Sequence, residues 1–174
     1  MTNAWLGGET QDAGSGKRQT RWLTPPHIVE ALGHFDLDPC GAPGHRLAEI
    51  TYLLEWGNDG LRDPWFGRVF LNPPYGKEAE PFLERLADHG CGTALIFART
   101  ETQSFHRLVW GRATAILFLK GRLSFLDAGG VRAKSNAGAP SCLIAYGEAD
   151  AQKLIESGLA GQYIHIGRTE AIAA

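Results

Sequence analysis

The chain is poor in the features that mark secreted, disulfide-bonded and membrane proteins. Its 174 residues contain only three cysteines, an odd number without regular spacing, so neither a disulfide framework nor a zinc site is indicated. No stretch approaches the ~20 consecutive apolar residues of a transmembrane helix. The first 20 residues have no apolar signal-peptide core. We therefore expect a cytoplasmic protein with no membrane partner.

The chain also lacks an excess of charge of either sign. Its formal net charge of −2 excludes a basic surface over the whole molecule. Residues 99–134, however, carry seven basic side chains against two acidic ones. This asymmetry suits a protein that meets a polyanion on one face, and an unevenly charged, solvated surface explains it equally well. The basic residues of this segment are Arg99, Arg107, Arg112, Lys120, Arg122, Arg132 and Lys134.

Common phosphate and metal motifs are missing as well. The glycine-containing loop at 37–44 lacks the G-x-G-x-x-G spacing, and no Lys-Ser or Lys-Thr pair follows it. This argues against a nicotinamide cofactor and against a nucleoside triphosphate. The six histidines share no spacing typical of metal ligands, so we expect no metal.

What the chain does have is an alternation of short strands and helices. Its length fits one domain, which we place at residues 21–170 behind a flexible, polar tail at 1–20. Thr24 is placed to cap the first helix, and Lys120-Gly121 marks the turn of a hairpin over 113–126. Such alternation predicts an α/β fold with an open, mostly parallel sheet flanked by helices. Predicted strands lie within 34–41, 50–56, 68–72, 92–98, 113–126, 141–147 and 162–167, and predicted helices within 24–34, 77–90, 102–111 and 148–158.

Two predicted strands end in loops with chemically active side chains, at the edge where such sheets bind their ligands. The first loop, "LDPCGAPG", places Asp38 directly after a strand, and Gly41 and Gly44 let the backbone approach a ligand closely. A carboxylate at this turn can pair with an ammonium group or hold ribose hydroxyls. An ordinary strand-ending turn has the same appearance, so this loop alone leaves both interpretations open.

The second loop, "NPPY", follows the apolar run at 69–71. Its prolines, Pro73 and Pro74, stiffen the backbone, so that the Pro73 carbonyl and the Asn72 side-chain amide are held as hydrogen-bond acceptors. Tyr75 adds a flat face on which a ring can stack. This combination suits a planar substrate with an amino group, such as a nucleobase, because two acceptors draw the nitrogen lone pair out of conjugation. The alternative is a rigid turn in which Asn72 is a cap and Tyr75 packs.

Several of these stretches resemble the motifs of one enzyme family. "FLNPPY" resembles the [D/N/S]-P-P-[Y/F/W] motif of amino-methyltransferases that use S-adenosylmethionine, and "LDPCGAPG" resembles their first motif, "DPxCGxG". "WLTPPHIVEAL" resembles the "TP" element that precedes it. Together with "DGLRDPWFG" and "KGRLSF", the ordered set is similar to small phage-type DNA N6-adenine methyltransferases (Dam-like) over roughly residues 21–147.

The resemblance implies a Rossmann-like methyltransferase fold and a role for each matching residue. Asp38 would face the methionine ammonium of S-adenosylmethionine, and Asp59 would lie near its adenine, with Glu55 as the competing acid. The implied catalytic residues are Asn72, Pro73, Pro74 and Tyr75. The implied cofactor residues are Trp22, Thr24, Pro25, Asp38, Pro39, Cys40, Gly41 and Asp59. The implied DNA-binding residues are Arg99, Lys120, Arg122, Arg132 and Lys134, in insertions at 99–112 and 120–140.

The implied reaction is methyl transfer to the N6 amine of an adenine extruded from double-stranded DNA. The implied setting is the cytoplasm of a bacterial host, with a phage or prophage origin. Two alternatives stay open: an amino-methyltransferase for RNA or a protein glutamine, and a catalytically inactive DNA-binding relative. The first motif departs from the family pattern by reading Ala-Pro-Gly in place of Ser-Gly at residues 42–44, which leaves room for the second alternative.

Overall fold

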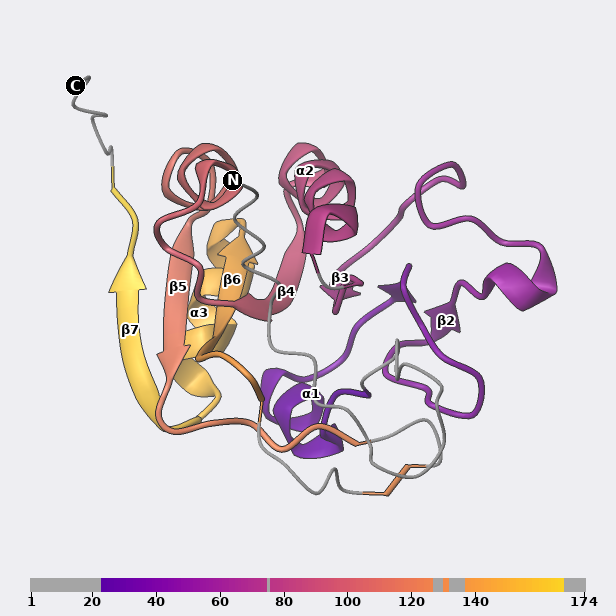
Figure 1. The fold of residues 1–174 in the computed structure, drawn as a ribbon, viewed down its shortest axis with the longest axis horizontal. Coiled ribbons are helices and arrows are strands. Elements are labelled where there is room, and N and C mark those ends of the chain that lie inside the picture. Colours follow the sequence, from indigo (N-terminus) through magenta and orange to yellow (C-terminus); the bar gives the residue numbers. More distant parts are fainter. Residues whose placement is uncertain (1–22, 75, 127–129, 132–136, 168–174) are drawn as a thin grey trace, which may run out of the picture.

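The computed structural model describes residues 23–74, 76–126, 130–131 and 137–167, whose arrangement is shown in Figure 1. The predicted tail at 1–20 lies outside these ranges, as do Trp22, Tyr75, Arg132 and Lys134. The strands are β1 (Leu37–Asp38), β2 (Ile50–Thr51), β3 (Val69–Leu71), β4 (Gly92–Phe97), β5 (Ala115–Leu119), β6 (Ser141–Tyr146) and β7 (Gly161–His165). The helices are α1 (Pro26–Leu32), α2 (Ala79–His89) and α3 (Glu148–Glu156), with shorter helical turns η1 (Leu54–Trp56), η2 (Gly76–Glu78) and η3 (Phe105–Trp110).

The strands form one mixed sheet in the order β2-β1-β3-β4-β6-β5-β7. β2, β1, β3 and β4 are parallel, whereas the pairs β4–β6, β6–β5 and β5–β7 are antiparallel. The predicted α/β class is confirmed, but the prediction of a mostly parallel sheet is wrong, because half of the pairings are antiparallel. β5 and β6 are neighbours joined without a crossover helix, and such a connection produces antiparallel strands.

The two halves of the sheet also differ in strand length. β1 and β2 have two residues each and β3 has three, whereas β4 and β6 have six each. β4 and β6 are paired along their whole length, from Gly92 opposite Tyr146 to Phe97 opposite Ser141. The regular hydrogen-bonded framework is therefore concentrated in the antiparallel half.

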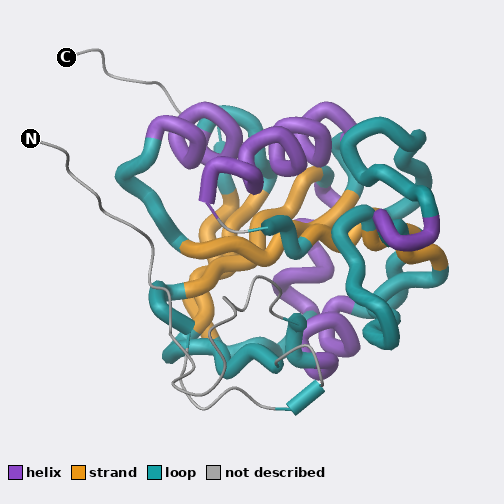
Figure 2. Tube along the Cα trace, turned by 45° about the vertical axis from the view of Figure 1, so that its right-hand side comes forward, coloured by secondary structure: helices purple, strands orange, loops and turns teal. Residues whose placement is uncertain are grey.

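Helices cover both faces of the sheet, as Figure 2 shows. Alternate side chains of a strand point to opposite faces. Phe70 of β3 and Leu95 of β4 accordingly pack with α1 and α3, whereas Val69 and Leu71 of β3 pack with α2 and η3. The result is a three-layer arrangement with two hydrophobic cores. Within the described part of the chain, no helix is long and apolar enough to cross a membrane.

The predicted hairpin over 113–126 is wrong in its second strand. After Leu119 the chain leaves the sheet and runs along its edge to a single bridge, in which Leu126 and Leu23 exchange backbone hydrogen bonds of 2.9 and 3.0 Å. β5 has β6 on one side and β7 on the other, so neither of its edges is open to residues 122–126.

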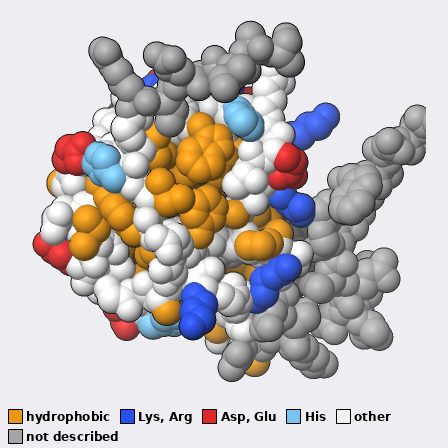
Figure 3. Space-filling model, turned by 90° about the vertical axis from the view of Figure 1, so that its left-hand side faces the viewer, with side chains coloured by type: hydrophobic (Ala, Val, Ile, Leu, Met, Phe, Trp, Pro, Cys, Tyr) orange, Lys and Arg blue, Asp and Glu red, His pale blue; other side chains and the backbone are white. Residues whose placement is uncertain are grey.

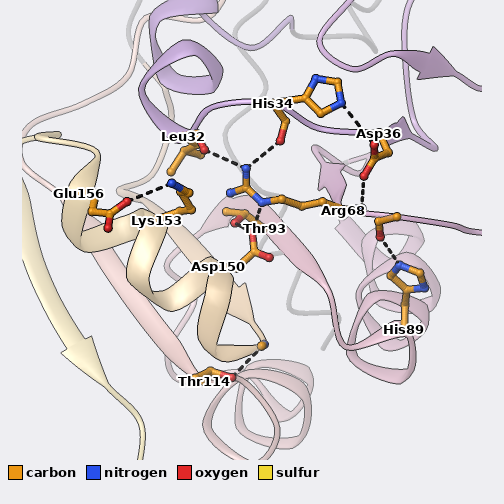
Figure 4. A network of polar contacts seen from close by, with 12 residues as sticks. Leu32, His34, Asp36, Arg68, His89, Thr93, Thr114, Asp150, Lys153 and Glu156 are labelled. Atoms are coloured by element: carbon orange, nitrogen blue, oxygen red, sulfur yellow. Dashed lines mark hydrogen bonds and ion pairs between the residues drawn. The ribbon is translucent and has the colours of Figure 1, made fainter.

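An ion pair between the half-buried Arg68 and the buried Asp150 ties the helical layer to the amino end of β3 (Figure 4). Arg68 donates from Nε to Asp150 of α3 at 2.9 Å, and from Nη1 to the carbonyls of Leu32 and His34 at 2.8 Å each. Thr93 of β4 donates its hydroxyl to the same Asp150 oxygen at 2.8 Å. The pair thus joins α1, α3, β3 and β4 at the end of the sheet away from the two loops with candidate functional residues.

Candidate active site

The two loops singled out in the sequence meet at one point of the sheet. β1 and β3 are neighbours, with Leu37 opposite Val69, and the chain passes from β1 to β2 on one side before returning to β3 on the other. Ligands of open α/β sheets bind in the crevice outside the strand carboxyl ends where the order reverses in this way. A cavity of about 480 Å³ opens there, walled by residues 38–42, 58–61 and 72–74 together with side chains from η2 and α2.

Asp38 is the most distinctive group of this cavity. It ends β1, is only 3% exposed, and its Oδ1 accepts a hydrogen bond of 3.0 Å from the Cys40 backbone N–H. Burial raises the pKa of Asp38 to about 7, and the Cys40 hydrogen bond opposes that rise. A buried carboxyl group in a cavity is suited to a cationic ligand, which would restore its charged form.

Two glycines allow the loops around Asp38 to pack closely. A Cβ atom at Gly41 would overlap the side-chain methyl of Thr51, and a Cβ atom at Gly60 would overlap the carbonyl oxygen of Pro39. Both positions therefore need glycine for space. The Gly60 contact lays the 58–61 segment directly against the loop that follows β1.

One of the two candidate acids lies in the wall of the cavity. Asp59 lies in the wall, where its Oδ1 accepts the Leu61 backbone N–H at 2.9 Å and its Oδ2 lies 3.4 Å from Arg62 Nε. Glu55 lies on η1, is exposed, and is not part of the wall. The structure therefore places Asp59 in the wall of the same cavity as Asp38, and Glu55 outside that wall.

Asn72 and Thr24 meet in the same cavity. The side-chain Nδ2 of Asn72 donates to Oγ1 of Thr24 at 3.0 Å, and Thr24 is fully buried. Thr24 was expected to cap α1, but the N-cap is Pro25, with no side-chain hydrogen bond. The expectation is wrong because the Thr24 hydroxyl is turned to Asn72. Pro73 joins Asn72 in the wall, whereas Pro25 does not.

The cavity wall also contains three further residues that the sequence predicted for the site: Pro39, Cys40 and Pro74. Burial, together with the neighbouring Asp38, raises the pKa of the Cys40 thiol well above its ordinary value. A thiol held in its neutral form is a poor nucleophile. Cys40 therefore serves as a small packing residue of the loop. Tyr75 and Trp22 lie outside the described residues, and their predicted roles stay predictions.

The structure adds His45 to the cavity, a residue to which the sequence assigned no chemistry. Its Nε2 is buried without a hydrogen-bond partner among the described residues, and burial lowers the pKa of the ring. The His45 backbone N–H donates to the Ala42 carbonyl at 3.1 Å, which folds the loop back on itself. No metal-type spacing marks this histidine, and its position seven residues after Asp38 is the only sequence signal for it.

Three of the predicted DNA-binding residues lie at the same edge of the sheet as the cavity. Arg99 follows β4, and Lys120 and Arg122 follow β5, which runs in the same direction as β4. Lys120 and Arg122 are exposed, and Arg122 donates to the Ala137 carbonyl at 3.0 Å. Figure 3 shows the side of the molecule edged by β7, where hydrophobic side chains gather in the middle and Lys and Arg side chains follow one margin.

Most of the predicted insertion at 99–112 instead packs against the body of the protein. η3 buries Phe105 in the core shared with α2. Arg107 pairs with Glu80 and Glu84 of α2, at 2.6 Å each, and Arg112 pairs with Asp88 at 2.8 Å. These two arginines are thus engaged with acidic side chains. A DNA-facing role for this segment stays a prediction that depends on Arg99.

No protein-family model matches the chain, and no curated protein matches it.

Proposed function

We propose that the protein is a DNA methyltransferase that transfers a methyl group from S-adenosylmethionine to the N6 amine of an extruded adenine. The observation that carries the proposal is the meeting of Asp38 and Asn72 in one cavity, at the strand-order reversal of the sheet. The carboxyl group of Asp38 suits a cationic cofactor, and the amide of Asn72 suits an amine substrate. The mixed α/β sheet flanked by helices is compatible with the Rossmann-like fold that this activity requires.

The cofactor side of the cavity fits S-adenosylmethionine in charge and space. Asp38 offers a buried carboxyl group to an ammonium, and Asp59 offers a carboxylate to hydroxyl groups. The close packing at Gly41 holds the loop that carries Asp38 against Thr51 of β2. A cavity of about 480 Å³ lies within the range of known small-molecule sites. When bound, S-adenosylmethionine supplies an electrophilic methyl group on a positively charged sulfur.

The substrate side of the cavity supplies acceptors. With Nδ2 of Asn72 directed to Thr24, the other end of the amide is a carbonyl oxygen, and the Pro73 carbonyl provides a second acceptor beside it. Two acceptors hold both hydrogens of an exocyclic amine and favour a pyramidal nitrogen with an available lone pair. Such a nitrogen loses its proton after it has gained positive charge, so the site needs no strong base.

The position of the basic residues supports DNA as the substrate. Lys120 and Arg122 lie on the edge to which Asn72 belongs, and contacts from such side chains to phosphate supply affinity without sequence information. Extrusion of a base costs a few kcal/mol, which contacts of this kind offset.

The test is transfer of a labelled methyl group from S-adenosylmethionine to unmethylated duplex DNA. The wild type is compared with Asn72→Ala and with Gln152→Ala, which removes an exposed amide on α3. We expect label as N6-methyladenine with the wild type and with Gln152→Ala, and none with Asn72→Ala. Absence of transfer by the wild type overturns the proposal. Calorimetry with S-adenosylmethionine then separates an enzyme for RNA or protein amides, which binds the cofactor, from an inactive DNA-binding relative, which does not.

A further inference from the structure

The side chain of Thr24 contacts the predicted catalytic amide of Asn72 and does not cap α1. Its Oγ1 is 3.0 Å from Asn72 Nδ2, although the two residues are 48 positions apart in the chain. The geometry points to Thr24 as the positioning residue for Asn72: by accepting from Nδ2, its hydroxyl holds the amide so that the carbonyl end can be directed to the substrate amine. The inference rests on the proposed function and deepens it.

The backbone around Thr24 is held on both sides. Leu23, the preceding residue, exchanges two backbone hydrogen bonds with Leu126. On the other side, Pro25 has a fixed φ and its carbonyl accepts the N–H of Ile28 in the first turn of α1, at 3.0 Å. Ile28 is itself buried in the core. A hydroxyl group attached to so constrained a backbone can hold a partner to the accuracy that catalysis requires.

The orientation of the amide matters because its two ends have opposite hydrogen-bonding character. The carbonyl end of Asn72 accepts hydrogen bonds, whereas its NH₂ end only donates them. A substrate amine presents hydrogens to the site. In a reversed amide, the NH₂ hydrogens of Asn72 would face those hydrogens, and no hydrogen bond could form between them. The Thr24 hydroxyl can donate as well as accept, so what it supplies is a fixed anchor for the amide, which in the structure lies with Nδ2 on the Thr24 oxygen. One hydrogen bond of ordinary net strength corresponds to about a fivefold effect.

The experiment compares Thr24→Val, Thr24→Ser and the wild type in single-turnover methyl transfer to duplex DNA. Valine keeps the shape of threonine and lacks the acceptor, whereas serine keeps the acceptor. We expect Thr24→Val to transfer methyl up to about fivefold more slowly, with calorimetric affinity for S-adenosylmethionine changed much less. Thr24→Ser should recover most of the wild-type rate.

Thr93→Val is the matched control, because Thr93 is also fully buried and its hydroxyl bonds to Asp150 far from the cavity. It should lower the free energy of unfolding and leave the transfer rate unchanged. A wild-type rate in Thr24→Val overturns the inference and leaves the proposed function standing. A loss of cofactor affinity in Thr24→Val as large as the loss of rate also overturns it, because Thr24 would then be a cofactor residue. Failure of the wild type to methylate DNA overturns the proposed function itself.

Discussion

The carboxyl group of Asp38 accepts the backbone N–H of Cys40 at 3.0 Å, two residues further along the loop. That bond stabilises the charged form, yet burial has the larger effect and raises the pKa of Asp38 to about 7. The group therefore changes charge within the ordinary working range of pH. Two predictions depend on this titration, one for cofactor binding and one for stability.

Cofactor affinity should increase with pH. An ammonium group prefers ionised Asp38, and the ionised fraction rises as pH rises through about 7. Between about pH 6 and about pH 7.5 we expect a several-fold gain in affinity for S-adenosylmethionine, with release of a proton on binding at the lower pH. Calorimetry in buffers of different ionisation enthalpy measures both quantities. Asp38→Asn should bind weakly at every pH, and a pH-independent affinity in the wild type would contradict the assignment of Asp38 to the ammonium.

The stability of the ligand-free protein should change with pH in the opposite direction. The pKa of Asp38 is higher in the folded state than in the unfolded chain, so the folded state holds its proton more tightly. The contribution of this group to stability is present below the unfolded pKa of about 4 and is lost as pH rises through about 7. We expect Asp38→Asn to raise the free energy of unfolding by up to about 4 kcal/mol above pH ~8. Urea unfolding across the pH range checks this, and equal curves for both proteins would refute it.

The close packing of the first loop should be visible as a pairwise effect. Gly41→Ala places a methyl group against the Thr51 methyl, and overpacking of this kind costs about 1–3 kcal/mol. Thr51→Ser removes the opposing methyl, so the double variant should recover stability and cofactor affinity. Thermal unfolding and calorimetry measure the two. Gly167→Ala, at an open position, is the control and should have no effect. Additive losses in the double variant would show that space is not what requires glycine at Gly41.

DNA binding should depend on Lys120 and Arg122 through charge alone. Each substitution to alanine should weaken binding to all duplex sequences alike and reduce the slope of log affinity against log salt concentration by about 1. Fluorescence anisotropy over a salt series measures the slope. Arg112→Ala is the matched control, because Arg112 already pairs with Asp88 at 2.8 Å. An unchanged slope in Lys120→Ala and Arg122→Ala would place the DNA elsewhere on the surface.

Local sequence signals predicted individual elements and the meeting of the two motif loops well. The apolar run at 69–71 forms β3, and Gly90 ends α2 in the left-handed conformation, with φ of 71°. The two motif loops lie at neighbouring strand ends because β1 and β3 are parallel. Each of these features is determined within a few residues, by burial pattern, proline or glycine.

Features that depend on distant segments were not predictable. An apolar strand such as β6 does not encode its direction, so its antiparallel place between β4 and β5 could not be inferred from its sequence. The threonine of a Thr-Pro-Pro stretch looks like a helix cap, and only the fold brings Thr24 to Asn72. His45 likewise lies in the cavity wall because of the fold, at a turn that no local sequence motif predicts.

Because the strands differ in length, the two halves of the sheet should differ in their resistance to local unfolding. Amide hydrogens of β4 and β6, paired over six residues each, should exchange with solvent only through global unfolding. β1 and β2, with two residues each, have few ladder bonds, so the loops that hold Asp38 and Asp59 can open locally while the rest of the sheet stays closed. A ligand as large as a nucleoside can then enter and leave the cavity through fluctuations that cost a small part of the folding free energy.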